Sequence, residues 1–372
     1  MTQAQLEKFI HYLQKENWLV FGPTERGGPT ESKIAPPAEI SPYLTAHGAT
    51  PNEIKSGGVF INQISRPEEL VLDNRLPFYS FKKFFVPEEE TLFEYKDSKL
   101  KELPEHKRVY PEPKRIALIG INILDLKAIN LYEQVFEKDP YFQARRRNLL
   151  IVGHAAVPEI EDPSTSSGQA NIFEYKYEED ILEHLPFDIF LAQKNNDKRF
   201  AISYKLFTGS IKGQRILEHF GYKNYQHIQF SGPVKEGKLD ERMVRLRDKL
   251  KNHHEPKIWE ELGVRCLECG KCTLICPTCF CFRIDDEAAL KENSGRRARC
   301  WDACFYQEFS EVAGGGKFLK NTADQIHFWY FHKFARIPDE FDFMGCVGCR
   351  RCARVCPVGI DIAEVLKEIE NS

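Results

Sequence analysis

The first hydrophobic pattern of the chain has helical spacing. Within residues 2–15 the apolar positions recur at intervals of three and four residues, as on one face of a helix. They are Leu6, Phe9, Ile10 and Leu13. Thr2 stands where an N-cap residue belongs. The pattern predicts an amphipathic helix, followed by a strand over residues 18–21 that ends at Gly22-Pro23.

Short apolar runs then alternate with stretches of helical spacing. Strands are expected at 58–61, 91–95, 116–120, 149–153, 188–192 and 200–203, and helices at 125–136 and 209–220. Residues 24–56 and 162–171, rich in Pro, Gly, Ser and Thr, are expected to form loops. Strands that alternate with helices predict an α/β region built on a mixed, partly parallel sheet.

The pattern changes near residue 232. A charged helix follows, with Leu239, Met243, Leu246 and Leu250 on one face. We therefore predict an α/β scaffold and docking domain over 1–235, a helical linker over 236–262, and a third region over 263–372. That last region shows short helices around cysteine runs and no convincing strand.

Composition narrows the class of protein. Among 372 residues, 52 Lys and Arg nearly balance 55 Asp and Glu, so nothing favours binding to nucleic acid or to an anionic membrane. No stretch approaches the length of a transmembrane helix, and the first residues do not resemble a secretory signal. All 12 cysteines lie between Cys266 and Cys356. Crowding of this kind indicates metal or redox chemistry in a reducing cytoplasm rather than scattered disulfides.

The cysteines fall into two runs of the same design. Residues 266–277 read CLECGKCTLICP and residues 346–357 read CVGCRRCARVCP, both of the form C-x2-C-x2-C-x3-C-P. In bacterial ferredoxins with two clusters, the first three thiolates of such a run bind one 4Fe–4S cluster and the fourth binds the other. The spacing predicts cluster 1 on Cys266, Cys269, Cys272 and Cys356, and cluster 2 on Cys346, Cys349, Cys352 and Cys276.

The alternative interpretation is a pair of structural zinc sites in an interaction protein, because C-x2-C also suits zinc. Zinc prefers two cysteine pairs, however, and each run offers a triple plus a distant fourth cysteine before proline. The 69 residues between the runs, 277–345, far exceed the gap of a minimal ferredoxin. We therefore expect an all-α, helical-ferredoxin-like dicluster domain rather than the small hairpin form.

Four further cysteines lie between the runs: Cys279, Cys281, Cys300 and Cys304. Four thiols are the number that a third cluster needs, but no third C-x2-C run exists. Buried free cysteines commonly act as small hydrophobic side chains. Packing beside the clusters is the favoured interpretation; a third metal site and a reactive thiol are the alternatives.

The second run also carries three arginines, Arg350, Arg351 and Arg354, and no acidic residue. Positive charge near a cluster raises its reduction potential. One hypothesis is therefore that cluster 2 is the easier to reduce. The alternative is that these arginines are solvated or contact a partner.

Motifs for substrate chemistry are missing from the sequence. Residues 314–317 (GGGK) lack the spacing of a phosphate-binding loop and are expected to form a turn, and Gly120 is not followed by a GxGxxG pattern. No nucleotide or flavin site, no catalytic residue and no nucleophile triad can be assigned. His253 and His254 are expected to be solvated, and His327 and His332 to lie in an aromatic core. Clusters without a substrate site imply partner subunits.

The residues around the cysteines resemble a known family. The chain is similar to the iron–sulfur β subunits of cytosolic NiFe hydrogenases (sulfhydrogenases), a family that includes an iron–sulfur subunit of anaerobic sulfite reductase. The resemblance rests on CLECGKCTLICPTCFCF, RARCWDACFYQEFSEVAGGGK, His332-Lys333-Phe334 and CVGCRRCARVCPVGID, with weaker likeness in PFYSFKKFFVPEEETLFEY, DLKAI and DPYFQARRRNLLIVG. It covers most of residues 75–372.

The resemblance implies an electron-transfer subunit. Such relatives pass electrons between a flavin subunit that binds NAD(P)H and a subunit with the catalytic metal, in a hydrogenase or, alternatively, in a sulfite or sulfur reductase. Relatives tend to have cysteine at the positions of Cys279, Cys281 and Cys304, but not at Cys300. They often carry further cysteines after the strands at 116–120 and 149–153, and this chain has none there.

Overall fold

The computed structural model describes residues 1–25, 58–73, 75–97, 99–100, 114–156, 179–193, 202–233, 241–252, 256–289 and 293–371. The chain divides into two compact units. Unit 1 comprises Met1–Phe81 and Glu112–Pro233, and unit 2 comprises Lys82–Pro111 and Val234–Ser372. This division differs from the predicted domains in two respects. Residues 82–111 group with the cysteine-bearing unit, and the expected linker 236–262 lies within that unit.

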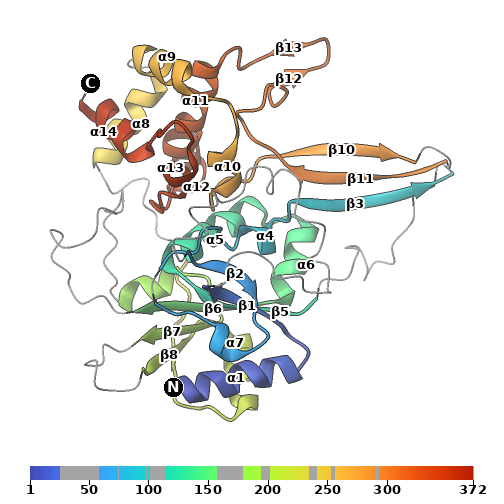
Figure 1. The fold of residues 1–372 in the computed structure, drawn as a ribbon, viewed down its shortest axis with the longest axis vertical. Coiled ribbons are helices and arrows are strands. Elements are labelled where there is room, and N and C mark those ends of the chain that lie inside the picture. Colours follow the sequence, from blue (N-terminus) through green and yellow to red (C-terminus); the bar gives the residue numbers. More distant parts are fainter. Residues whose placement is uncertain are drawn as a thin grey trace. The chain divides into compact units, whose positions relative to one another are not determined.

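Unit 1 is built on a seven-stranded mixed sheet of order β2-β1-β5-β6-β7-β8-β9 (Figure 1). Its strands are β1 (Leu19–Thr24), β2 (Phe60–Gln63), β5 (Ile116–Ile121), β6 (Leu149–Ala156), β7 (Ile189–Gln193), β8 (Tyr204–Thr208) and β9 (Gln226–His227). Strands β1, β5, β6 and β7 are parallel neighbours, whereas β2 and β8 run antiparallel to β1 and β7. The predicted mixed sheet with helices is confirmed.

Helices cover both faces of this sheet. Helices α1 (Gln3–Lys15) and α7 (Ile211–Phe220) lie on one face, and α5 (Ile123–Val135) and α6 (Pro140–Asn148) lie on the other (Figure 1). The predicted apolar face of α1 is buried against β1, β5 and β6, and Thr2 caps the helix through a capping box. Two short 3-10 segments, η1 (Pro67–Glu69) and η3 (Glu179–His184), complete the described part of this unit.

Several boundaries in unit 1 differ from those expected. Strand β1 continues through Gly22-Pro23, because its pairing with β5 ends at Phe21 and only the side facing β2 is still paired at Pro23. Of the strand expected at 200–203, residues 200–201 lie outside the described residues, and the observed strand β8 begins at Tyr204. Most of the loop expected at 24–56, the loop expected at 162–171, and His253 and His254 lie outside the described residues.

Unit 2 contains both cysteine runs and a set of short helical segments. They are α4 (Lys82–Phe85), α8 (Glu241–Lys251), α9 (Pro256–Arg265), α10 (Lys271–Ile275), α11 (Thr322–Phe331), the π-helical segment η5 (His332–Arg336), α12 (Ile337–Phe341), α13 (Arg351–Val355) and α14 (Ile362–Asn371). Helix α11 packs against α8 and α9, and α10 packs against α13. The charged helix expected from Leu239 onward is confirmed as α8 from Glu241, and Leu239 itself lies outside the described residues.

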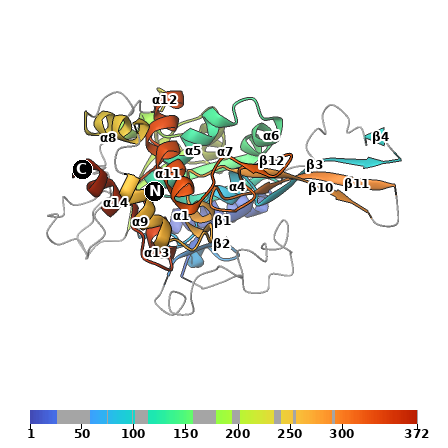
Figure 2. The same ribbon diagram turned by 90° about the horizontal axis from the view of Figure 1, so that it is seen from above.

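Unit 2 also contains strands, so the all-α description of this domain is wrong. Strands β10 (Phe282–Ala288) and β11 (Ser294–Trp301) form an antiparallel ribbon between the two cysteine runs. Strands β3 (Glu89–Lys96) and β4 (Lys99–Leu100) extend it to four strands, and the ribbon projects away from the helices of the unit (Figure 2). The sequence does not predict this ribbon. Strand β10 is exposed at nearly every position, so it lacks the alternation of buried apolar and exposed polar residues by which a strand is recognised.

A second hairpin lies in the same stretch. Strands β12 (Glu311–Val312) and β13 (Gly316–Lys317) pair around a turn in which Gly314 and Gly315 have positive φ. The expectation of a turn rather than a phosphate-binding loop is confirmed here. None of the helices in the described residues could cross a membrane, judged by their length and hydropathy.

Candidate metal centre

The two cysteine runs fold into loops of matching conformation. In the first loop Glu268 and Gly270 have φ of 52° and 69°, and in the second Gly348 and Arg350 have φ of 73° and 52°. These are the residues immediately before and after the second cysteine of each run. Left-handed backbone at a non-glycine residue is strained and persists only where the surroundings impose it. The same strained turn therefore occurs twice.

Each loop directs backbone N–H groups at a cysteine sulfur. The N–H of Glu268 donates to Cys266 Sγ and that of Gly348 donates to Cys346 Sγ, both at 3.4 Å. The N–H of Ile360 donates to Cys356 Sγ at 3.3 Å. Such donors stabilise negative charge on sulfur, which is the charge that a metal-bound thiolate carries.

A short helix follows each loop. Helix α10 begins after Gly270 and ends at Cys276, and α13 begins after Arg350 and ends at Cys356. Pro277 and Pro357 follow directly, where a further helical N–H is missing and the chain turns away. Because α10 and α13 pack together, the last cysteine of each run is brought toward the other run.

Several other cysteine sulfurs lie close to the sulfur of Cys272. Burial raises the pKa of the Cys272 thiol well above its ordinary value, and the neighbouring sulfurs of Cys304, Cys266, Cys269 and Cys356 raise it further. The pKa of Cys266 is likewise raised by burial and by the neighbouring sulfurs of Cys269 and Cys356. The last cysteine of the second run therefore lies with the first three cysteines of the first run.

The sulfur of Cys352 lies among those of a second group. Burial raises the pKa of Cys352 well above its ordinary value, and the sulfurs of Cys276, Cys346, Cys349 and Cys272 act in the same direction. Burial also raises the pKa of Cys346 to about 12, with Cys276 as one of its neighbours. Cys356 is thus among the neighbours of Cys272, and Cys276 is among the neighbours of Cys352, while the assignment of ligands to two clusters stays a prediction from the spacing.

The donor chemistry of the two sets bears on which metal they would hold. Among the described residues, no three His, Cys, Asp or Glu side chains already converge on one point. The two predicted sets are four thiols each, buried or half-buried in unit 2. A four-thiol set supplied by C-x2-C-x2-C and a distant cysteine has the donor chemistry of a 4Fe–4S cluster.

Two buried lysines lie beside these thiols, and neither was predicted from the sequence to belong to the site. Lys333 is 2% exposed and Lys82 is 5% exposed. The Lys333 ammonium donates to Cys276 Sγ at 3.2 Å. Burial alone would lower the pKa of Lys333, but the sulfurs of Cys276, Cys279 and Cys346 raise it well above its ordinary value. The one signal in the sequence was that Lys333 stands in the His332-Lys333-Phe334 motif of the resemblance.

Three of the four extra cysteines lie in the same region. Cys279 hydrogen-bonds with Cys276, and this bond lowers the pKa of Cys276 below its ordinary value despite burial. The sulfur of Cys281 is close enough to raise the pKa values of Cys279 and Cys304. The sulfur of Cys304 in turn raises the pKa of Cys272.

Cys300 lies elsewhere in the unit. It is on β11, where its neighbours in the ribbon are Arg283 and Glu89. The structure therefore separates Cys300 from the other three, in agreement with the pattern that the resemblance implied.

The arginines of the second run do not form a simple positive patch. The Arg350 guanidinium is paired with the Asp361 carboxylate. Arg351 is 1% exposed, so it is not a solvated side chain. The two histidines of the aromatic run lie as expected. His327 bonds to the Leu250 carbonyl at 3.2 Å, and His332 stacks on Phe328.

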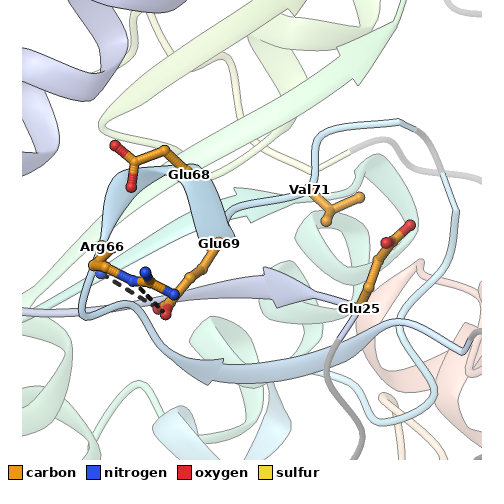
Figure 3. A pocket seen from close by; sticks show the side chains of 5 residues that line it. All are labelled: Glu25, Arg66, Glu68, Glu69 and Val71. Atoms are coloured by element: carbon orange, nitrogen blue, oxygen red, sulfur yellow. Dashed lines mark hydrogen bonds and ion pairs between the residues drawn. The ribbon is translucent and has the colours of Figure 1, made fainter.

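Unit 1 has a surface pocket without redox residues. It is lined by Glu25, Arg66, Glu68, Glu69 and Val71 (Figure 3). The arginine is engaged by Glu69 at 3.3 Å, and the other two charged side chains in the lining are acidic. Such a lining repels phosphate groups.

Comparison with known proteins identifies the cysteine region. Residues 265–360 match the family described as a 4Fe-4S dicluster domain. The chain as a whole is similar to sulfhydrogenase 2 subunit beta of Pyrococcus furiosus, with 26% identity over 322 residues, which is 83% of this chain and 88% of the relative.

The resemblance predicted from the sequence is therefore confirmed. The dicluster match spans both cysteine runs and the strands between them, so the ribbon strands β10 and β11 lie within the matched residues. No solved structure matches the chain significantly.

Proposed function

We propose that this chain is the electron-transfer subunit of an oxidoreductase complex and holds two 4Fe–4S clusters. The observation that supports the proposal is that Cys356 is among the neighbours that raise the pKa of Cys272, and Cys276 is among those that raise the pKa of Cys352. Cluster 1 is assigned to Cys266, Cys269, Cys272 and Cys356, and cluster 2 to Cys346, Cys349, Cys352 and Cys276.

When bound, a 4Fe–4S cluster accepts and releases single electrons. The chain supplies the rest of the function. Its thiolates hold the metal, the loop N–H groups of Glu268 and Gly348 stabilise charge on sulfur, and burial of Cys276 and Cys346 excludes water. Because Cys272 lies in α10 and Cys276 directly follows this helix as its C-cap, the two predicted sets each take a ligand from the same short segment. This proximity favours electron exchange between the two sites.

The proposal includes partner subunits. The relative in P. furiosus is named as a subunit of a sulfhydrogenase. By that likeness, one partner binds a flavin and NAD(P)H and another carries the catalytic metal, in a NiFe hydrogenase. The alternative is an anaerobic sulfite or sulfur reductase, which would use the same relay.

Anaerobic purification tests the proposal. The purified chain should be brown, contain about eight iron atoms and as many acid-labile sulfides, and lose its visible absorption when dithionite reduces it. A colourless protein that contains zinc would contradict the proposal and favour the structural alternative.

A tagged chain purified anaerobically from its own cells identifies the complex. Nickel and flavin that co-purify in stoichiometric amounts support the hydrogenase assignment. Sirohaem in place of nickel would replace it with a sulfite reductase. A chain that carries both clusters but no redox partner would contradict the subunit role.

A further inference from the structure

Lys333 connects the two cysteine runs through a single buried ammonium group. Its Nζ donates to Cys276 Sγ at 3.2 Å and to Thr278 Oγ1 at 3.1 Å, both at the end of the first run. The same Nζ donates to the Gly345 carbonyl at 2.9 Å, directly before the second run. All three donor positions of the ammonium are therefore used.

The backbone holds this lysine in place. Lys333 lies in the π-helical segment η5, an irregularity that often marks functional sites. The Gly345 N–H donates to the Lys333 carbonyl at 2.9 Å, so the second run is anchored to the lysine by its backbone as well. A Cβ on Gly345 would lie 2.7 Å from Lys333 Cα, and only glycine permits this approach.

The partners of Lys333 reinforce one another. The Thr278 hydroxyl donates to the Gly345 carbonyl at 2.7 Å and lies 3.1 Å from Cys276 Sγ. Thr278 is 1% exposed, so this network is shielded from water. A buried ammonium is costly unless anionic groups compensate it, and a hydrogen bond from a charged donor to sulfur is stronger where water is excluded.

We propose that Lys333 sets the reduction potential of the cluster held by Cys276, Cys346, Cys349 and Cys352, making that cluster the easier of the two to reduce. This inference rests on the proposed function. One electron enters on reduction, and Lys333 keeps its three protons in both states. The added negative charge strengthens the N–H···S bond, so the lysine stabilises the reduced state more than the oxidised one.

The cluster held by Cys266, Cys269, Cys272 and Cys356 has no such bond to a lysine among the described residues. Its sulfurs accept from backbone N–H groups, and the other set has such a donor as well. The two sets therefore differ in their hydrogen bonds to sulfur, because only the set with Cys276 accepts one from Lys333 among the described residues. Any effect of the arginines of the second run on the potential is separate from this one.

The second buried lysine provides a matched control. Lys82 Nζ lies 3.5 Å from the Leu274 carbonyl and 4.0 Å from the centroid of the Trp301 ring. It is buried like Lys333, and it is close enough to Cys279 and Cys276 that these sulfurs act to raise its pKa against the effect of burial. Its hydrogen bond to Leu274, however, ends on a carbonyl oxygen rather than on sulfur.

The test is a redox titration of the full chain followed by EPR, comparing wild type with Lys333→Met, Lys333→Arg and Lys82→Met. In Lys333→Met, one cluster should become at least tenfold harder to reduce, a fall of about 59 mV for a one-electron couple. The potential of the other cluster should move much less. Lys333→Arg keeps a charged donor and should restore part of the shift, and Lys82→Met should shift that cluster less than Lys333→Met.

The outcomes separate this inference from the proposed function. Unchanged potentials in a Lys333→Met chain that retains both clusters would overturn the inference and leave the function intact. So would equal shifts of both clusters, or an equal shift in Lys82→Met. A wild-type chain without iron would overturn the proposed function itself. If Lys333→Met does not retain its iron, Lys333→Gln takes its place, because glutamine keeps a hydrogen-bond donor but carries no charge, and an unchanged potential in that variant overturns the inference.

Discussion

Glu268 and Gly348 occupy the same place in the two cysteine loops, and each donates its N–H to the first sulfur of its run at 3.4 Å. Both have positive φ, although only one of them is glycine. The equivalence shows that loop conformation, rather than residue identity, is what the two runs share.

This loop conformation leads to a first prediction. Gly348→Val places a β-branched side chain at a φ of 73° and should destabilise the second loop by at least about 1–2 kcal/mol. The variant should lose the iron of one cluster more readily on mild chelation. Gly348→Asn, which tolerates left-handed backbone, is the control and should retain both clusters. Equal iron loss in the two variants would show that the backbone conformation is not the cause.

The extra cysteines lead to a second prediction. Cys279, Cys281 and Cys304 are proposed to pack beside the clusters rather than to bind a third one. Replacing all three by alanine should leave about eight iron atoms per chain, as in wild type. A wild-type content of about twelve that falls to about eight in the triple variant would establish a third cluster instead. Cys300→Ala is the matched control, since Cys300 lies apart on β11.

The position of β3 in unit 2 leads to a third prediction. Arg299 on β11 and Glu90 on β3 form a buried ion pair at 2.5 Å, with side chains 9% and 8% exposed. Arg299→Met leaves the Glu90 carboxylate buried without this partner and should cost about 3 kcal/mol of unfolding free energy. The double variant Arg299→Met/Glu90→Met should recover much of that loss. Additive losses in the double variant would argue against the pairing of β3 with β11.

A buried histidine leads to a fourth prediction. Burial lowers the pKa of His154 on β6 to about 4, against 6.5 ordinarily. The folded state therefore binds this proton less readily than the unfolded state. The free energy of unfolding therefore has its full value above pH 6.5 and decreases as the pH falls toward 4, because the unfolded state then takes up the proton first. Between pH 7 and pH 5 this residue should remove about 2 kcal/mol of stability.

Urea unfolding at both pH values checks this expectation. His154→Leu cannot take up the proton, so its stability should fall about 2 kcal/mol less than that of wild type over the same range. An identical pH dependence in both chains would show that His154 is not buried in the neutral form.

The elements of unit 1 could be predicted well from the sequence because their patterns are local. The apolar stripe of α1 and the buried runs of β5 and β6 are each visible within a few residues. The matching conformation of the two cysteine loops was also foreshadowed, since both runs have the same spacing. In both cases the decisive information lies within short segments.

The parts that escaped prediction depend on contacts between distant segments. Strand β3 pairs with β11 across about 200 residues, and Lys333 reaches Cys276 across 57 residues. No local pattern around Lys333 distinguishes it from a solvated lysine. The arginines of the second run attracted attention because they are close together in sequence, yet Arg350 is compensated by Asp361.

Iron analysis of paired cysteine variants is the sharpest test of the crossed arrangement of the two clusters. Cys276→Ala should remove one cluster and leave about four iron atoms per chain. Adding Cys349→Ala should remove nothing more, because both residues are assigned to the same cluster. Adding Cys269→Ala instead should remove the remaining iron, and Cys356→Ala should give the mirror pattern. Retention of about four iron atoms in Cys276→Ala/Cys269→Ala, with complete loss in Cys276→Ala/Cys349→Ala, would refute the crossed arrangement.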